Sequence, residues 1–573
     1  MADPKRAPRK TDALNDRAAT LIAQGMFADA MKACIRSLRV HETERAKALF
    51  VRLIKPDPRP DDPSARPYLI RALTDAWCRT GQLVPASFAL IKSNPAVGEC
   101  IQRAVSSWPT RLSPQELFGT AGLAACADDD LLIAVLESTP AAGLEFEHFL
   151  TLARHALLVH IVRATAPEHV DGSAFRLGCA LARQCFINEY VYECTPEEGG
   201  HVASLGDAIE KRIVEAQAAP RAWLAAFACY RPLVSLHGCE RLTTSASGRA
   251  LSGLLSQQVK EPLRERACRA TLPKLTAITD AISLQVTHQY EKNPYPRWVR
   301  SPSVNAETFS EFLQQELGVE ASRFAGRLDA ADVLVAGCGT GQQSIQTARK
   351  LPSARILAVD LSVSSLAYAA CKTRELGMSN IEYAQADILE LASIGKTFDL
   401  IQCVGVLHHL ADPVAGWRVL RSLLRPGGVM QVGLYSEIAR SRIAAAQKLI
   451  VEQDYESTTE GIRRFRVDLQ SLGRWRPFRN LVAIEDFYDT SGCRDLFFHV
   501  KEHRFTLPQI KRCLAELDLE FVQLNVEPAV QERFSARFPG ELARSDLNSW
   551  TQFEVENPST FLGMYNFYAR RRA

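Results

Sequence analysis

Residues 332–341 constrain the fold of this chain more than any other stretch. Their letters, DVLVAGCGTG, join an apolar run to three glycines, and a second apolar run, ILAVD, ends at Asp360. Glycines allow a sharp turn and the close approach of a ligand, and the helix that follows begins with free amide groups. This order predicts a strand, a turn, a helix and a second strand, which make one half of a nucleotide-binding α/β sheet.

Three more apolar runs follow along the chain. We expect a third strand at 381–388 and a fourth at 398–410 that opens into the letters VLHHL. Residues 423–435 then predict a helix end, a Pro-Gly-Gly turn and a fifth strand. The glycine spacing departs from the dinucleotide pattern G-x-G-x-x-G, because Gln342 stands at the position of the third glycine. That difference disfavours a nicotinamide cofactor.

Together these segments resemble class I S-adenosylmethionine-dependent methyltransferases, especially the branch whose fourth strand runs into V-L-H-H-L. The resemblance covers about residues 331–436. It implies an α/β fold with a Rossmann-like, seven-stranded sheet, mostly parallel with an antiparallel last strand, preceded here by a large α-helical domain. The alternating segments 520–526 and 561–568 predict the closing antiparallel pair.

The resemblance also implies how S-adenosylmethionine, the expected cofactor, is held. The glycine turn would hold its methionine end, Asp360 would bind the ribose, and Cys403 would bind the amino group through its backbone carbonyl. Ala336 stands where the family usually has an acid, and a glutamine after the turn is the expected substitute. The cofactor-binding residues expected in this domain are Gly337, Cys338, Gly339, Gly341, Gln342, Asp360, Leu361, Asp387, Ile388 and Cys403, of which Leu361, Asp387 and Ile388 would take the adenine.

Length and composition limit the remaining possibilities. A chain of 573 residues is too long for this sheet alone and indicates two to four domains. A net charge of +3 produces no global attraction to nucleic acid or membrane. The 15 cysteines include no C-x-x-C pair, and no secretory signal or long apolar stretch is present. These features predict a cytoplasmic protein with reduced thiols.

Residues 1–280 have helical periodicity almost throughout. Segments 25–30 and 81–86 resemble the tetratricopeptide helix-turn-helix, although they lie 56 residues apart and not 34. We therefore expect a degenerate tetratricopeptide-like domain at 1–280. A peptide-binding solenoid and an irregular domain that packs against the catalytic one both fit this pattern.

Residues 281–330 form the expected linker. Two prolines give its segment THQYEKNPYPRW an extended path. One interpretation is a lid, with Tyr290 or Tyr295 near the sulfonium and Arg297 near the carboxylate of the cofactor. The other is a linker whose aromatic side chains anchor one domain on the other.

The methyltransferase domain is expected at 331–573, with an insertion at about 437–504. Two segments of the insertion, at 463–466 and 474–479, mix arginines with aromatic residues. Such a patch can bind RNA or an anionic substrate, but a solvated surface or an anchor is the more common role, so nucleic acid is disfavoured.

Histidines supply the candidates for catalysis and metal binding. His408 is expected at the mouth of the cleft as a base, with Tyr435 and Glu437 as further cleft candidates. The string formed by His499, Glu502 and His503 matches H-x-x-E-H. That zinc motif needs a helix and a third ligand, whereas the preceding letters LFFHV are typical of a strand, so no metal is expected.

The implied reaction is direct displacement by an acceptor nucleophile on the methyl group. Because the sulfonium is already activated, the protein mainly aligns and desolvates the reactants. Three functions remain open: a methyltransferase acting on a small molecule or biosynthetic intermediate, a protein methyltransferase whose helical domain binds a polypeptide partner, and a cofactor-binding scaffold without turnover.

Overall fold

A computed structural model describes residues 6–55, 63–164, 172–243, 248–318, 330–471 and 475–572. The chain forms two compact units, and neither is continuous in sequence. The helical unit comprises Met1–Leu263, Trp298–Ser303 and Glu456–Cys493. The sheet unit comprises Arg264–Arg297, Val304–Tyr455 and Arg494–Ala573.

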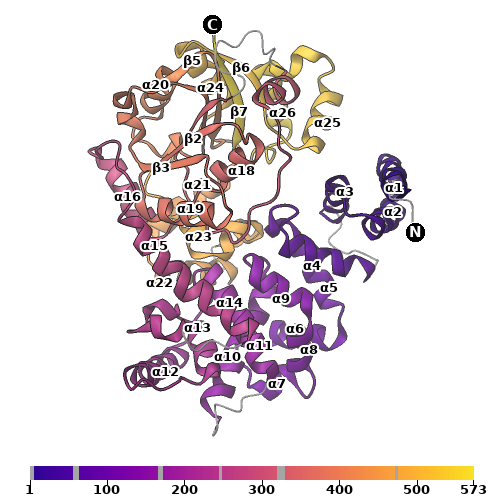
Figure 1. The fold of residues 1–573 in the computed structure, drawn as a ribbon, viewed down its shortest axis with the longest axis vertical. Coiled ribbons are helices and arrows are strands. Elements are labelled where there is room, and N and C mark those ends of the chain that lie inside the picture. The colour runs from indigo at the N-terminus through magenta and orange to yellow at the C-terminus, as the bar shows by residue number, and fades with distance from the viewer. Residues whose placement is uncertain are drawn as a thin grey trace. The chain divides into compact units, whose positions relative to one another are not determined.

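The helical unit contains the N-terminal helices and one helix from the expected insertion (Figure 1). Its helices are α1 (Arg6–Ala23), α2 (Phe27–Val40), α3 (Glu44–Ile54), α4 (Arg66–Thr74), α5 (Val84–Lys92), α6 (Pro95–Ser107), α7 (Pro114–Phe118), α8 (Gly122–Asp128), α9 (Asp130–Ser138), α10 (Leu144–Val162), α11 (Gly172–Ile187), α12 (Pro196–Val214), α13 (Arg221–Ala228), α14 (Arg249–Leu255) and α22 (Thr459–Gln470). The helix α15 (Glu261–Arg269) crosses the boundary between the units.

The two segments that resemble tetratricopeptide turns have different structures. Gly25, with φ of +74°, ends α1 before α2 begins, as a helix-turn-helix requires. Gly81 lies instead in the short turn η2 (Thr80–Leu83), and a Cβ atom there would overlap the Glu485 side chain. A regular repeat therefore does not extend through both segments.

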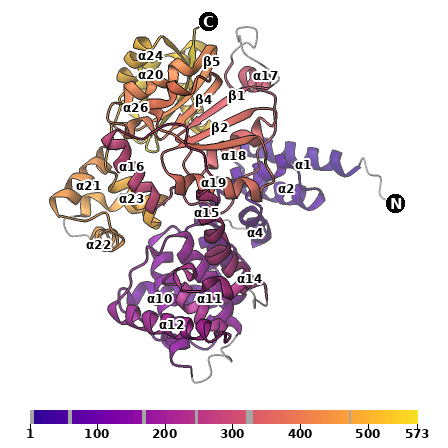
Figure 2. The same ribbon diagram turned by 60° about the vertical axis from the view of Figure 1, so that its left-hand side comes forward.

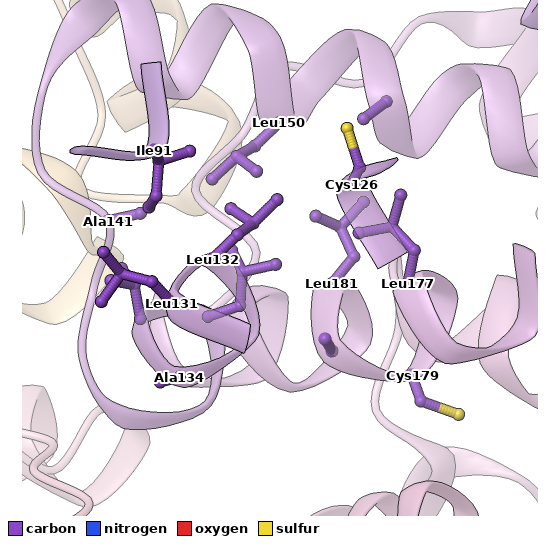
Figure 3. Packing of buried hydrophobic residues seen from close by; sticks show 14 of the residues in the cluster. Ile91, Cys126, Leu131, Leu132, Ala134, Ala141, Leu150, Leu177, Cys179 and Leu181 are labelled. Carbon is purple, nitrogen blue, oxygen red and sulfur yellow. The ribbon is translucent and has the colours of Figure 1, made fainter. Parts of the chain in front are cut away.

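Apolar side chains from several helices form the core of the helical unit. Figure 3 shows Leu132 of α9 near Leu150 of α10 and Leu181 of α11, and each of these leucines is almost completely buried. Within the described residues, no helix combines the length and the apolarity needed to cross a bilayer.

The sheet unit contains a seven-stranded sheet in the order β3-β2-β1-β4-β5-β7-β6 (Figures 1 and 2). Its strands are β1 (Asp332–Ala336), β2 (Arg355–Asp360), β3 (Ile381–Gln385), β4 (Phe398–Val404), β5 (Leu424–Leu434), β6 (Leu519–Leu524) and β7 (Tyr565–Arg571). The first five strands are parallel, whereas β7 pairs antiparallel with both β5 and β6. The predicted fold class is therefore confirmed.

Helices cover both faces of this sheet. Alternate residues of β1 point to opposite sides, so that Leu334 belongs to one apolar cluster and Val333 to another. The helices of the sheet unit are α16 (Ala281–Lys292), α17 (Phe309–Glu311), α18 (Gln342–Lys350), α19 (Val363–Glu375), α20 (Pro413–Leu423), α21 (Ser441–Glu452), α24 (Leu507–Glu516), α25 (Pro528–Arg537) and α26 (Leu547–Glu556). The clusters place α20, α24, α25 and α26 on one face and α17, α18 and α19 on the other.

The boundaries of the units differ from the predicted ones. Residues 264–280 belong to the sheet unit, because Gln385 of β3 donates a backbone hydrogen bond to Pro273 and accepts one from Leu275. The expected insertion is divided, since Glu456–Cys493 belongs to the helical unit and the flanking parts to the sheet unit. Of the expected linker, residues 319–329 lie outside the described residues.

Two predictions of strands were wrong. The LFFHV run was expected to be a strand, but α23 (Thr490–Phe497) includes its first two residues. Asp489 accepts a hydrogen bond from the Gly492 amide at 2.6 Å, which stabilises the start of this helix. The last strand begins at Tyr565 and not at 561, because residues 558–563 form a turn.

Candidate active site

The glycine turn follows β1 at the carboxyl edge of the sheet. The order reverses between β1 and β4, and parallel α/β sheets bind ligands at such a switch point. Gly337, Gly339 and Gly341 have φ values of +76°, +51° and +82°. A Cβ atom at Gly337 would overlap Val406 of the VLHHL loop, so this turn needs both the positive φ and the missing side chain.

Asp360 joins the glycine turn to the end of β2. Its two carboxylate oxygens accept hydrogen bonds from the Gly339 amide at 2.8 Å and the Ser362 amide at 2.9 Å. Burial raises the pKa of Asp360 above its usual value, and these amide bonds oppose that shift. Because each oxygen has a second lone pair, the carboxylate can also accept bonds from two ribose hydroxyls.

The expected adenine contacts lie at the ends of β2 and β3. Asp387 is buried, and its carboxylate accepts a hydrogen bond from the Leu389 amide at 3.0 Å. Its own amide donates to Thr276, a residue that no motif indicated. Ile388 is buried beside it, and Leu361 directly follows Asp360.

The remaining expected contacts lie at the ends of β1 and β4. Cys338 and Cys403 are buried, which raises the pKa of both thiols and leaves only their backbone groups suited to binding a polar ligand. Gln342 is the first residue of α18, whereas the Gln343 side chain bonds Gln431 at 3.4 Å. Of the two glutamines, Gln342 is therefore better suited to replace the acid missing at Ala336.

The proline-containing segment lies against the glycine turn. A Cβ atom on Gly339 would come within 2.9 Å of the Tyr295 carbonyl oxygen, and the Thr340 hydroxyl donates to the Pro296 carbonyl at 2.5 Å. Arg297 has protein partners of its own, because it lies 3.7 Å from Glu265 and over the Tyr368 ring.

A cluster of histidine and tyrosine rings lies next to the turn. His408 and His409, in the short turn η10 (Leu407–His409) after β4, contact each other, and His408 packs on Tyr435 with ring centroids 3.8 Å apart. His499 stacks on His409 at 3.6 Å. Tyr290 of α16 is 5.9 Å from His499 and completes the cluster.

His408 is fully buried, so it is not exposed at the mouth of a cleft as expected. Burial lowers the pKa of His408 and of His409 well below the usual value, which keeps both rings neutral. The Nδ1 atom of His409 bonds the Lys501 carbonyl at 2.7 Å. The buried cluster thus contains two uncharged imidazoles.

The H-x-x-E-H string does not form a zinc-peptidase site. Its three residues lie in an irregular segment after α23, and Glu502 forms ion pairs with Arg440 at 2.9 Å and Arg504 at 3.1 Å. Glu502 is therefore already neutralised by arginines. His503 contributes its amide to a hydrogen bond with the His408 carbonyl at 2.8 Å.

The arginine-aromatic segments belong to the helical unit. Arg466 is buried, pairs with Glu147 at 2.5 Å and also donates to the Phe487 carbonyl, while Arg463 donates to the Tyr190 carbonyl. Phe465 and Trp475 are buried against each other. These side chains anchor the segment internally, and Arg474 lies outside the described residues.

Asp495 is the most informative residue that the sequence did not indicate. Its Oδ1 accepts a hydrogen bond from the Tyr290 hydroxyl at 2.5 Å across 205 residues of sequence. Arg440 stands over the Tyr435 ring at 3.5 Å and was also missed. Neither residue belongs to a motif, although their partners Tyr290 and Tyr435 were singled out in the sequence.

The fold and the glycine turn define a class I methyltransferase arrangement. A family model described as a methyltransferase domain matches residues 333–428. That region is similar to methyltransferase domains, and S-adenosylmethionine is the cofactor that the match and the relatives indicate.

Two curated relatives and one solved structure illustrate these similarities. An uncharacterized protein of Synechococcus sp. is 40% identical over 127 residues, which cover 22% of this chain and 30% of that protein. A trans-aconitate 2-methyltransferase of Deinococcus radiodurans is 34% identical over 137 residues, which cover 24% of this chain and 49% of that protein. The chain therefore spans less than half of either relative.

The solved structure is that of PKMT2 from Rickettsia typhi in complex with AdoHcy. It is 17% identical, covers 46% of this chain and 55% of that chain, and has a TM-score of 0.36.

Proposed function

We propose that this protein transfers the methyl group of S-adenosylmethionine to a small molecule or biosynthetic intermediate. The observation that carries the proposal is the arrangement of Asp360, which binds the Gly339 amide at the switch point of the sheet and keeps acceptor capacity for a ribose. The similarity of the domain to a trans-aconitate 2-methyltransferase, and the VLHHL loop after β4, support an acceptor of low molecular weight.

Bound S-adenosylmethionine supplies an electrophilic methyl group on a positively charged sulfur. The acceptor's lone pair forms the bond to the methyl carbon, the carbon–sulfur bond breaks toward sulfur, and the acceptor's proton, where it has one, leaves to solvent or a base. The protein holds the two reactants in line and excludes water. In our proposal Asp360 and Asp387 position the cofactor, and His408 stays a candidate for contact with the acceptor.

We propose that the segment 290–297 covers the bound cofactor as a lid. The contacts of Tyr295 and Pro296 with the glycine turn support this role, whereas Arg297 is held by Glu265. We expect Tyr295→Ala to weaken binding of S-adenosylhomocysteine in calorimetric titration, and Arg297→Ala to have a smaller effect. If Tyr290, Tyr295 and Arg297 variants all fold and keep wild-type affinity, the segment is an anchor and not a lid.

A protein methyltransferase is the second candidate. It is favoured by the large helical unit, whose degenerate tetratricopeptide-like part would bind a polypeptide acceptor. A scaffold without turnover is the third, since Ala336 replaces the usual acid.

All 15 cysteines are free thiols, which supports a cytoplasmic location.

Methyl labelling of a cell lysate separates these functions. The full chain is incubated with lysate and S-adenosylmethionine labelled in its methyl group, and small-molecule and macromolecular fractions are counted. We expect label in the small-molecule fraction, and much less with Asp360→Asn. Label confined to protein would favour the second candidate, and cofactor binding without any transfer would favour the scaffold.

A further inference from the structure

Three side chains with metal-binding atoms meet in the sheet unit. They are His409, Asp495 and His499, and one ligand atom of each lies within 4.8 Å of the other two. His409 comes from the turn after β4, Asp495 from the last turn of α23, and His499 from the irregular segment after that helix. The fold thus brings together donors that are far apart in the sequence.

Hydrogen bonds orient two of the three side chains for a ligand. His409 uses Nδ1 to donate to the Lys501 carbonyl at 2.7 Å, which puts its lone pair on Nε2. A backbone acceptor on the second ring nitrogen is the usual support of a metal-binding histidine. Asp495 receives the Tyr290 hydroxyl on Oδ1, which leaves Oδ2 as the donor atom toward the histidines.

The third side chain has an unsatisfied buried atom. His499 Nε2 is buried and has no hydrogen-bond partner among the described residues. Burying a polar atom without a partner costs free energy, on the order of 1–3 kcal/mol. The stacked rings of His409 and His499 do not relieve that cost, because the lone pairs and N–H groups lie in the ring planes.

The charges around this cluster favour a cation. Asp495 supplies a carboxylate oxygen beside two imidazole rings. Arg440, which stands over the Tyr435 ring, is paired with Glu502 at 2.9 Å. Two imidazoles and a carboxylate suit first-row transition metals, whereas Mg²⁺ prefers oxygen ligands throughout.

We propose that His409, Asp495 and His499 form a binding site for a divalent first-row transition metal ion such as Zn²⁺. Ligand atoms on one such ion lie about 3 to 3.5 Å apart, given metal–ligand distances of about 2.0–2.2 Å, so the three donors move closer on binding. The His409 and His499 rings stack with 22° between their planes. An ion bound by both must lie near the plane of each ring, so one ring has to rotate. His499 is the ring that turns. Its Nδ1 accepts a 3.2 Å bond from the Lys501 amide, which puts the ring hydrogen on Nε2, so binding the ion through Nε2 breaks this bond and moves the hydrogen to Nδ1.

The location gives the ion a role in binding the acceptor. Tyr290, whose hydroxyl donates to Asp495, begins the segment 290–297, which lies against the glycine turn through Tyr295 and Pro296. Three protein ligands leave at least one coordination position for water or an acceptor atom. This role rests on the proposed function, whereas metal binding itself does not.

The test is a metal titration of the chelator-treated full chain. We expect one Zn²⁺ per chain by calorimetry, and visible absorption bands from bound Co²⁺ that report histidine coordination. His499→Ala and Asp495→Ala should each weaken Zn²⁺ binding by more than about tenfold, since even outer partners of a metal contribute roughly 10–100-fold. Zn²⁺ should raise the melting temperature of the wild type and not of these variants.

Two matched variants control for other histidines. His288→Ala removes an exposed histidine of the same unit, and His503→Ala removes the last histidine of the H-x-x-E-H string. Both should bind Zn²⁺ as the wild type does. Absence of one-to-one binding, or equal loss in His503→Ala and His499→Ala, overturns the proposal.

The affinity for S-adenosylhomocysteine, measured with and without Zn²⁺, keeps the two proposals separate. Unchanged cofactor affinity together with no metal binding rejects only the metal site. If the chain binds the metal but no lysate fraction acquires methyl label, only the proposed function is rejected. A confirmed site would also replace the sequence-based expectation that the chain binds no metal.

Discussion

At the scale of single residues, Asp360 links the cofactor site to the backbone that surrounds it. Its carboxylate holds the glycine turn through Gly339 and the start of α19 through Ser362. In both bonds a backbone amide is the donor, so each carboxylate oxygen must act as an acceptor. Asp360 therefore has a structural role even before a ligand binds.

The first prediction concerns Asp360→Asn. Asparagine keeps one accepting oxygen, but its NH2 group cannot accept from an N–H, so one of the two backbone bonds is lost. We expect the dissociation constant of S-adenosylhomocysteine to rise about 10- to 100-fold, the value of a hydrogen bond to a charged group. Calorimetric titration measures it, with Glu382→Gln, an exposed acid on β3, as the control. Wild-type affinity in Asp360→Asn would exclude the ribose role.

The second prediction compares two glycines with positive φ. Gly377, with φ of +67°, has open space around its Cβ position. Gly377→Ala should therefore lose only the unfolding free energy that the left-handed backbone costs an alanine, about 1–2 kcal/mol. Gly339→Ala must also displace the Tyr295 carbonyl. We expect a larger loss of unfolding free energy in denaturant titrations for Gly339→Ala, and weaker binding of S-adenosylhomocysteine for that variant alone. Equal behaviour of the two variants would contradict the contact between turn and segment.

Residues of the candidate site differ in how well the sequence indicates them. The glycines and Asp360 were predictable because backbone geometry demands them directly after a strand. Asp495 was not, since its partner Tyr290 is distant in sequence and a single acid carries no pattern. The histidine pair in VLHHL was noticed, but its full burial depends on Tyr435 and on the segment near Lys501.

At the scale of elements, a charged cluster links the amino ends of four strands. Arg425 of β5 bonds Asp399 of β4 at 2.6 Å and Asp332 of β1 at 2.8 Å, and Arg355 of β2 also bonds Asp332. Partial burial opposes ionisation of Asp332, but the two arginines hold its pKa below the usual value. This edge is opposite the glycine turn, so it supports the fold and not the ligand.

The third prediction follows from that depressed pKa. The folded state binds the proton of Asp332 less tightly than the unfolded state, so its contribution is complete above about pH 4 and is lost as the pH falls further. Asp332→Asn should lower the unfolding free energy at pH 7 by about 1 kcal/mol, because the site is partly solvated. Denaturant titrations should show the difference shrinking toward pH 3, with unchanged affinity for S-adenosylhomocysteine at pH 7. A difference independent of pH would argue against the ion pairs.

Strands of the sheet were predictable because apolar runs ended at glycines or acids in the right order. The α23 segment was misjudged for the opposite reason. Its aromatic residues favour a strand locally, yet Asp489 caps a helix there and both Leu496 and Phe497 are buried. Tertiary packing therefore overrides local propensity at this point.

At the scale of the whole molecule, the segment 456–493 is part of the helical unit. Its buried Arg466 pairs with Glu147 of α10, which is 319 residues away in sequence. Arg466 also bonds the Val191 carbonyl. The arginine-aromatic pattern, which suggested a surface for anionic ligands, is largely an internal anchor of this unit.

The fourth prediction tests that anchor. Removing one partner leaves a buried charge unpaired, so Arg466→Met and Glu147→Leu should each lower the unfolding free energy by about 3–5 kcal/mol. The double variant should lose much less than the sum. Circular dichroism in a denaturant titration measures these losses, with Arg479→Met, an exposed arginine, expected to change stability by less than about 0.5 kcal/mol. Additive single effects would mean that the pair is not coupled.

The discontinuity of the two units also sets an order of events during synthesis. The helical unit lacks its last segment until Cys493 has left the ribosome, long after Leu263. At about 5–20 residues per second, this delay lasts roughly 10 to 50 s. Until Arg466 has been synthesised, Glu147 has no ion-pair partner, so the nascent helices are exposed to chaperones and proteases while the first five strands of the sheet unit are made.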